Sequence, residues 1–151
     1  MAALIGIANT TGEVPLSAAT AKTILQVQSP SNHRLKILGW GVYFDGTSSS
    51  AEPIQVRLLE QQNTGTMFPL TINKQDPSLR ETIQSTASIN ATAEPAVGLT
   101  IFKRIEVHPQ GGYEELRPFS QEYIVSGNGK VGIECTAPAT VNVHGYINFE
   151  E

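Results

Sequence analysis

The stretch RLKILGWGVYFDGTSSSAEPIQVRLLEQ, residues 34–61, contains the pattern that decides the fold class. In its first half, every second side chain of LGWGVYF is large and apolar, which predicts a β-strand with one buried face. The adjacent pair Ile37 and Leu38 interrupts this alternation once, so we expect a β-bulge there. A second alternating run begins at Ile54, after a turn rich in Gly and Ser. The stretch therefore predicts two long strands, with Trp40, the only tryptophan of the chain, in the core.

Similar alternation, interrupted by Gly, Pro, Ser and Asn turns, is found through the rest of the chain. Strands are expected over residues 23–28, 67–72, 100–108, 113–116, 122–126, 130–136 and 141–150, while 82–92 fits either a weak strand or an irregular segment. No run of 10 to 15 residues has the period of an amphipathic helix. The sequence therefore predicts an all-β fold, an antiparallel β-sandwich with jelly-roll topology. An immunoglobulin-like sandwich is the alternative, although its paired cysteines are missing.

The chain divides into an N-terminal segment and one larger unit. Residues 1–20 carry a single charge, at Glu13, and are too short and too interrupted by Gly for a stable helix. We expect them to form an extended N-terminal arm ahead of a single β-sandwich domain at residues 21–151. Two interpretations of the arm stay open: it is the first strand of the domain's own sheet, or it adds a strand to a neighbouring subunit.

Composition and charge argue against several kinds of partner. The 151 residues carry a net charge of −4, and their ten Lys and Arg residues are scattered. Because the basic residues form no row that could follow the phosphate backbone of a nucleic acid, nucleic acid is not an expected partner. No membrane partner is expected either, since no run approaches the ~20 apolar residues of a membrane helix. The first basic residue, Lys22, comes too late for a secretory signal, so we expect synthesis in a reducing cytoplasm, with the lone Cys135 as a buried hydrophobe.

Recognised catalytic and metal-binding motifs are missing from the sequence. It contains no GxSxG elbow, HExxH pair, CxxC pair or P-loop. The histidines His33, His108 and His144 are scattered, and we expect them at the surface. Glu114 and Glu115 are neighbours, so they point apart on a strand and are expected as solvated side chains. The sequence therefore predicts no catalytic residue, no metal and no cofactor, and a protein that is not an enzyme.

A resemblance to a known family rests on four segments. They are VQSPSNHRLKILGWGVYFDGTSSSAEPIQVRLLEQ (27–61), NATAEP (90–95), EVHPQGG (106–112) and TAPATVNVHGYINFEE (136–151). These segments resemble the small β-sandwich proteins that decorate or cement the capsids of tailed bacteriophages. The resemblance implies a structural virion protein that binds the major capsid protein outside an icosahedral head and stabilises it as a homotrimer. It implies no cofactor, and it places the protein on the capsid surface after synthesis in the host cytoplasm.

Two short groups of residues are candidates for contacts with a partner. In the predicted arm, the aliphatic side chains of Leu4, Ile5 and Ile7 are available for burial against a shell protein or another subunit. On the strand expected at residues 100–108, both faces mix polar and apolar side chains, so one face is expected to meet another subunit. Phe102 and Arg104 are the candidate partner-binding residues of that strand.

Two functions of other classes remain open from the sequence. One is a jelly-roll adhesion or carbohydrate-binding module of a virion, although one Trp and four Tyr offer few stacking platforms. The other is a divergent enzyme with a cupin-like fold, which would need a metal site that the sequence does not show.

Overall fold

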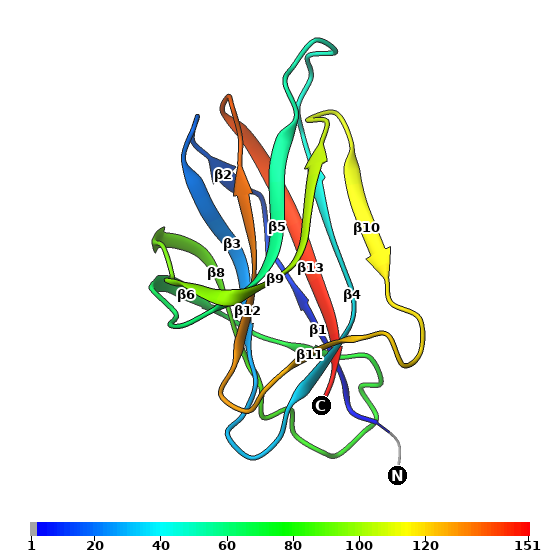
Figure 1. Ribbon diagram of the computed structural model, residues 1–151. Coiled ribbons are helices and arrows are strands. Elements are labelled where there is room, and N and C mark those ends of the chain that lie inside the picture. The colour runs from blue at the N-terminus through cyan, green and yellow to red at the C-terminus, as the bar shows by residue number, and fades with distance from the viewer. Residues whose placement is uncertain (1–2) are drawn as a thin grey trace.

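The computed structural model describes residues 3–151, and all its regular elements are β-strands (Figure 1). Met1 and Ala2 of the predicted arm lie outside the described residues. The strands are β1 (Ile5–Asn9), β2 (Val14–Leu16), β3 (Ala21–Gln28), β4 (Leu35–Phe44), β5 (Ile54–Gln61), β6 (Thr66–Leu70), β7 (Asn73–Lys74), β8 (Thr86–Ala93), β9 (Val97–Val107), β10 (Gly112–Leu116), β11 (Tyr123–Val125), β12 (Lys130–Thr136) and β13 (Val141–Glu150). The region of 82–92 that the sequence left undecided is thus largely a strand, β8.

These strands form two antiparallel sheets that pack face to face (Figure 1). Sheet A has the order β10-β4-β13-β1-β7, with β11 also beside β4 and β2 beside β13. Sheet B has the order β6-β8-β3-β12-β5-β9. The prediction of an all-β, antiparallel β-sandwich is confirmed.

The strand order of sheet B interleaves early and late parts of the chain. In the run β3-β12-β5-β9, each neighbour comes from a distant part of the sequence. The chain meanwhile passes repeatedly from one sheet to the other. It does so between β2 and β3, β3 and β4, β4 and β5, β9 and β10, β11 and β12, and β12 and β13, and the short β7 adds a further excursion into sheet A between β6 and β8. Such interleaving is what two Greek keys wound into a double sheet produce, so the order favours a jelly roll over an immunoglobulin-like sandwich. The pair β6 and β8 extends sheet B beyond β3.

The central strand β4 contains the predicted bulge. Its register with β13 pairs Asn148 with Gly39 and then Phe149 with Ile37, which leaves Leu38 as the extra residue. Because one residue is added, Ile37 and Trp40 both point into the core, although they are three positions apart. Both side chains are fully buried, which confirms the prediction for Trp40.

The N-terminal segment is built into sheet A. β1 pairs antiparallel with β13 on one side and with β7 on the other, and β2 pairs with β13 further along. Ala8, Val14 and Leu16 are buried. Pairing within the sheet satisfies the backbone N–H and C=O groups and offsets the entropy lost on ordering this segment. Of the two interpretations, the described part of residues 1–20 is therefore the first strand of the domain's own sheet, and it does not stand apart as a separate arm.

The closing hairpin supplies much of the core. Val143, Ile147 and Phe149 of β13 are fully buried, as their period of two predicts. Cys135 of β12 is also fully buried, and burial raises the pKa of its thiol far above the ordinary value, with the nearby Glu134 carboxylate adding to the effect. This side chain is thus a core residue and not an accessible thiolate.

Replacing Trp40 with alanine should lower the free energy of unfolding by about 3 to 5 kcal/mol, because it empties a large core volume. Urea denaturation followed by far-UV circular dichroism measures this loss. Trp40→Phe keeps an aromatic ring in the core and should cost less. A near-neutral Trp40→Ala variant would contradict the central place of this side chain.

Candidate binding surface

The residues predicted to bind a partner fall in two separate places. Leu4, Ile5 and Ile7 lie at or beside the start of β1, which runs between β13 and β7 in sheet A, and all three are half-buried. Phe102 and Arg104 lie on β9, at the edge of sheet B. The two groups are therefore separate candidate contacts.

β9 is an edge strand, because it pairs only with β5. Its other side presents backbone N–H and C=O groups of the kind that a second chain can bind. The apolar side chains of Val97, Leu99 and Ile101 are exposed on its first half, and Leu99 is 99% exposed. The sequence predicts this strand only from Thr100, although Val97 and Leu99 continue the alternation of Ile101 and were the signal that could have extended it.

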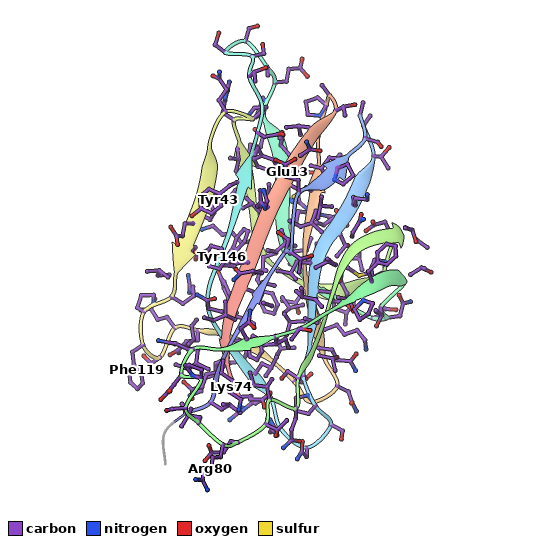
Figure 2. All side chains as sticks on the ribbon, turned by 180° about the vertical axis from the view of Figure 1, so that it is seen from behind. Glu13, Tyr43, Lys74, Arg80, Phe119 and Tyr146 are labelled. Atoms are coloured by element: carbon purple, nitrogen blue, oxygen red, sulfur yellow. The ribbon has the colours of Figure 1, made fainter. Side chains whose placement is uncertain are left out.

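The edge of sheet A beside β9 is also unpaired and also carries exposed apolar side chains. A turn at residues 108–111 joins β9 to β10, and both β10 and β11 pair only with β4, so these edges border one side of the sandwich (Figure 1). Phe119, 90% exposed, points away from the body of the protein in the loop after β10 (Figure 2). We call these two edges together the open side. Its exposed apolar residues are Val97, Leu99 and Ile101 on the β9 edge, and Leu116, Phe119 and Ile124 on the β10–β11 edge.

Aromatic contacts join the two edges of the open side from within. The rings of Phe102 on β9 and Tyr123 on β11 have their centroids 5.1 Å apart. The guanidinium carbon of Arg117 lies 4.3 Å from the centroid of the Tyr123 ring, a cation–π contact. Phe102, predicted as a partner contact, is thus half-buried against its own chain. Arg104 is exposed and forms no ion pair with another residue of 3–151.

Glu115 is the centre of a polar network behind these aromatic side chains. Its carboxylate accepts hydrogen bonds from Trp40 Nε1 at 3.0 Å, Arg117 Nη1 at 2.7 Å, the Tyr123 hydroxyl at 3.1 Å and the Tyr113 hydroxyl at 3.4 Å. Its side chain is only 10% exposed. The prediction of a solvated carboxylate is therefore wrong for Glu115. On β10 this residue shares the inward face with Tyr113, whereas Glu114 points outward and is exposed, as predicted.

The network also sets the ionisation of Glu115. Burial alone would raise the pKa of this carboxyl, but the hydrogen bonds from Arg117, Trp40 and Tyr123 outweigh burial and hold the pKa below its ordinary value. The same environment raises the pKa of the Tyr123 hydroxyl, through burial first and then through the neighbouring carboxylate. Glu115 is thus held as an anion, and its hydrogen bonds link Trp40 in the core to Arg117 and Tyr123 at the open side.

Comparison with protein-family models, with curated proteins and with solved structures found no match to this chain. Within residues 3–151, no group of three or more His, Cys, Asp or Glu side chains is placed to hold a metal ion. No helix in the same range is long and apolar enough to cross a membrane. The open side is distinguished by its exposed apolar side chains at two sheet edges.

Glu115→Gln should lower the free energy of unfolding by about 1 to 3 kcal/mol near pH 7, because it weakens a hydrogen-bonded charge pair. Since the folded pKa of Glu115 lies below its ordinary value of 4.5, the stabilisation is complete above that value and is lost as pH falls through the folded pKa. The difference between wild type and variant should therefore be constant at neutral pH and shrink as pH falls below 4.5, as urea titrations at each pH can measure.

Glu106→Gln provides the matched control, because Glu106 lies exposed on β9 and the substitution removes the same charge outside the network. It should change stability by less than about 0.5 kcal/mol at every pH. An equal effect of the two substitutions, or a Glu115→Gln effect that does not change with pH, would contradict the role assigned to this carboxylate.

Proposed function

We propose that this chain is a structural virion protein, a head decoration or cement protein that binds the outside of an icosahedral capsid and stabilises it. The single observation that carries the proposal is the open side, where two sheet edges meet and apolar side chains are exposed. Exposed apolar groups such as Leu99 and Phe119 are stabilised by transfer out of water, so a surface of this kind is suited to contact with protein. The resemblance of the four sequence segments to capsid decoration proteins supports the choice of partner.

The working unit in this proposal is a homotrimer. The open side offers two different edges, β9 with Leu99 and β10–β11 with Phe119. A contact between the β9 edge of one subunit and the β10–β11 edge of the next joins unlike surfaces, and such head-to-tail contacts close into a ring when the rotation fits. Arg104 on β9 is available for an ion pair across that contact. The threefold count comes from the resemblance.

The capsid contact is assigned to the major capsid protein. Leu4, Ile5 and Ile7 remain half-exposed near the start of β1, and we keep them as candidate contacts with the shell. Three copies of a weak contact on one rigid trimer raise the overall avidity without any single strong contact. Because β1 is an interior strand of sheet A, deletion of residues 2–12 would remove part of the fold, and substitution of exposed side chains is the sounder test.

Leu99→Asp and Phe119→Asp should each weaken trimer formation at least about tenfold, because a carboxylate would have to lose water at the contact. Analytical ultracentrifugation at micromolar concentration measures the change. Phe68→Asp is the matched control: Phe68 is an exposed aromatic residue on β6, away from the open side, and its substitution should leave the trimer intact. A monomeric wild type, or trimers that persist in both variants, would overturn the proposed assembly.

Attachment to a capsid is tested on purified phage particles stripped of this protein. Wild-type protein should rebind and raise the temperature at which the particles release DNA, and electron microscopy should place it on the outer surface as threefold density. The Leu99→Asp variant should rebind more weakly, because it loses avidity, while Phe68→Asp should rebind as wild type does. Wild-type protein that fails to bind the particles would overturn the capsid assignment, whatever its oligomeric state.

A further inference from the structure

The outer face of sheet A carries a pair of tyrosines that the core and the open side do not use. Tyr43 of β4 and Tyr146 of β13 point out of the same face, and in Figure 2 they lie beside each other on the side turned to the viewer. In the register of the sheet, Tyr43 stands between Gly112 and His144, and Tyr146 is in register with Gly41. The two rings thus start from adjacent rows of the sheet, separated by about 7 Å along the strands.

Both rings lie flat on the sheet because glycines leave room beneath them. A Cβ atom at Gly41 would be only 2.6 Å from Cε1 of Tyr146, and one at Gly112 would be only 2.5 Å from Cδ1 of Tyr43. Each ring therefore covers a glycine of the neighbouring strand and leaves its outer face open. Tyr43 is 45% exposed. The result is an aromatic floor made of two ring faces.

One carboxylate holds both rings in place. Tyr43 donates its hydroxyl to Glu114 Oε2 at 3.1 Å, and Tyr146 donates its hydroxyl to Glu114 Oε1. Burial first, and then the Glu114 carboxylate, raise the pKa of both tyrosines, so both hydroxyls stay protonated and keep donating. Fixing the rings in advance lowers the entropy that a ligand would lose by ordering them.

The floor is bordered by groups that can accept hydrogen bonds. Oxygen atoms of Glu114 and of both phenol groups retain lone pairs beyond those used between themselves. Beside Tyr43 and Tyr146 lies a shallow hollow of about 210 Å³, which is also lined by Asn9, Thr10, His144 and Gly145. Further along β13 on the same face, Asn148 Oδ1 is buried without a hydrogen-bond partner among residues 3–151.

We propose that this face, which we call the tyrosine face (Tyr43, Glu114, His144 and Tyr146), binds a neutral oligosaccharide. A pyranose ring has an apolar face of C–H groups that matches an open aromatic ring, and hydroxyl groups around its rim that match carboxylate and phenol acceptors. Two rings that start from rows of the sheet about 7 Å apart along the strands suit successive sugar units of one chain. The inference is independent of the proposed function, because the tyrosine face is made within one subunit and does not need a capsid.

A cationic side chain is the competing ligand, since aromatic rings and carboxylates also attract positive charge. Cation sites of the aromatic-cage type place rings on several walls around the charge. Here both rings lie in the floor, and Glu114 already accepts two hydroxyl groups. The open, flat arrangement therefore favours the face of a sugar over a compact cation.

The test uses the full chain and a panel of neutral polysaccharides: dextran, glycogen, galactomannan, arabinoxylan, hydroxyethylcellulose and a mixed-linkage β-glucan. In native gels that contain each polymer, at least one should slow the wild-type protein. Tyr43→Ala and Tyr146→Ala should each weaken that retardation at least about tenfold in apparent affinity, because each removes one ring of the floor. Tyr146→Phe keeps the ring and loses the hydroxyl, so it should retain more of the binding than Tyr146→Ala.

Phe68→Ala is the control, since it removes an exposed aromatic ring from the other sheet and should leave retardation unchanged. Melting temperatures of all variants, read by circular dichroism, separate loss of the tyrosine face from loss of the fold. Failure of every polymer to slow the wild type would overturn the proposal, as would equal retardation of the wild type and both alanine variants. Shifts of the Tyr43 and Tyr146 ring resonances by tetramethylammonium, with none caused by the polymers, would also overturn it and assign the tyrosine face to cations.

Discussion

The extra residue at Leu38 is the constraint on which the rest of the structure depends. Without it, the alternation of β4 would place Ile37 and Trp40 on opposite faces of sheet A, since they are three positions apart. With it, both are buried, and the next positions along the strand turn Gly41 and Tyr43 outward. One irregularity in one strand therefore sets the composition of the core and of the outer face together.

Because Trp40 points inward from β4, the carboxylate of Glu115 is tolerated near the core. Trp40 is large and carries an indole N–H that needs an acceptor when it is buried. Glu115 provides that acceptor from the neighbouring strand, and Arg117 with Tyr123 satisfies the rest of its charge at the rim. The edge strands β9, β10 and β11 can thus keep apolar side chains exposed to water, because a polar network with satisfied hydrogen bonds holds these strands in place.

Local pattern was enough to predict much of this fold. Strands with a period of two, such as β12 and β13, were predicted with their observed bounds, and the break at Leu38 was visible in the sequence because it interrupts an otherwise regular run. Pairing between distant segments was beyond such reasoning. Nothing within residues 1–20 says that β13 is their partner, and nothing beside Glu115 says that Trp40, 75 positions away, donates to it. Both outcomes depend on contacts that exist only once the sheets have formed.

The two candidate surfaces of this protein differ in the interactions that they offer to a partner. The open side lies along sheet edges, where unpaired backbone groups and exposed side chains such as Leu99 and Phe119 suit a large protein contact. The tyrosine face lies on the outer surface of sheet A. Glycines there leave room for two tyrosine rings to lie against the sheet, and the fixed rings suit a small, weakly held ligand. Glu114 of the tyrosine face lies on β10, an edge strand of the open side, so the two surfaces are neighbours along that strand. In the proposed trimer, an edge contact that leaves the outer face of sheet A uncovered would place three tyrosine faces on one rigid unit, and avidity would then strengthen a weak sugar contact.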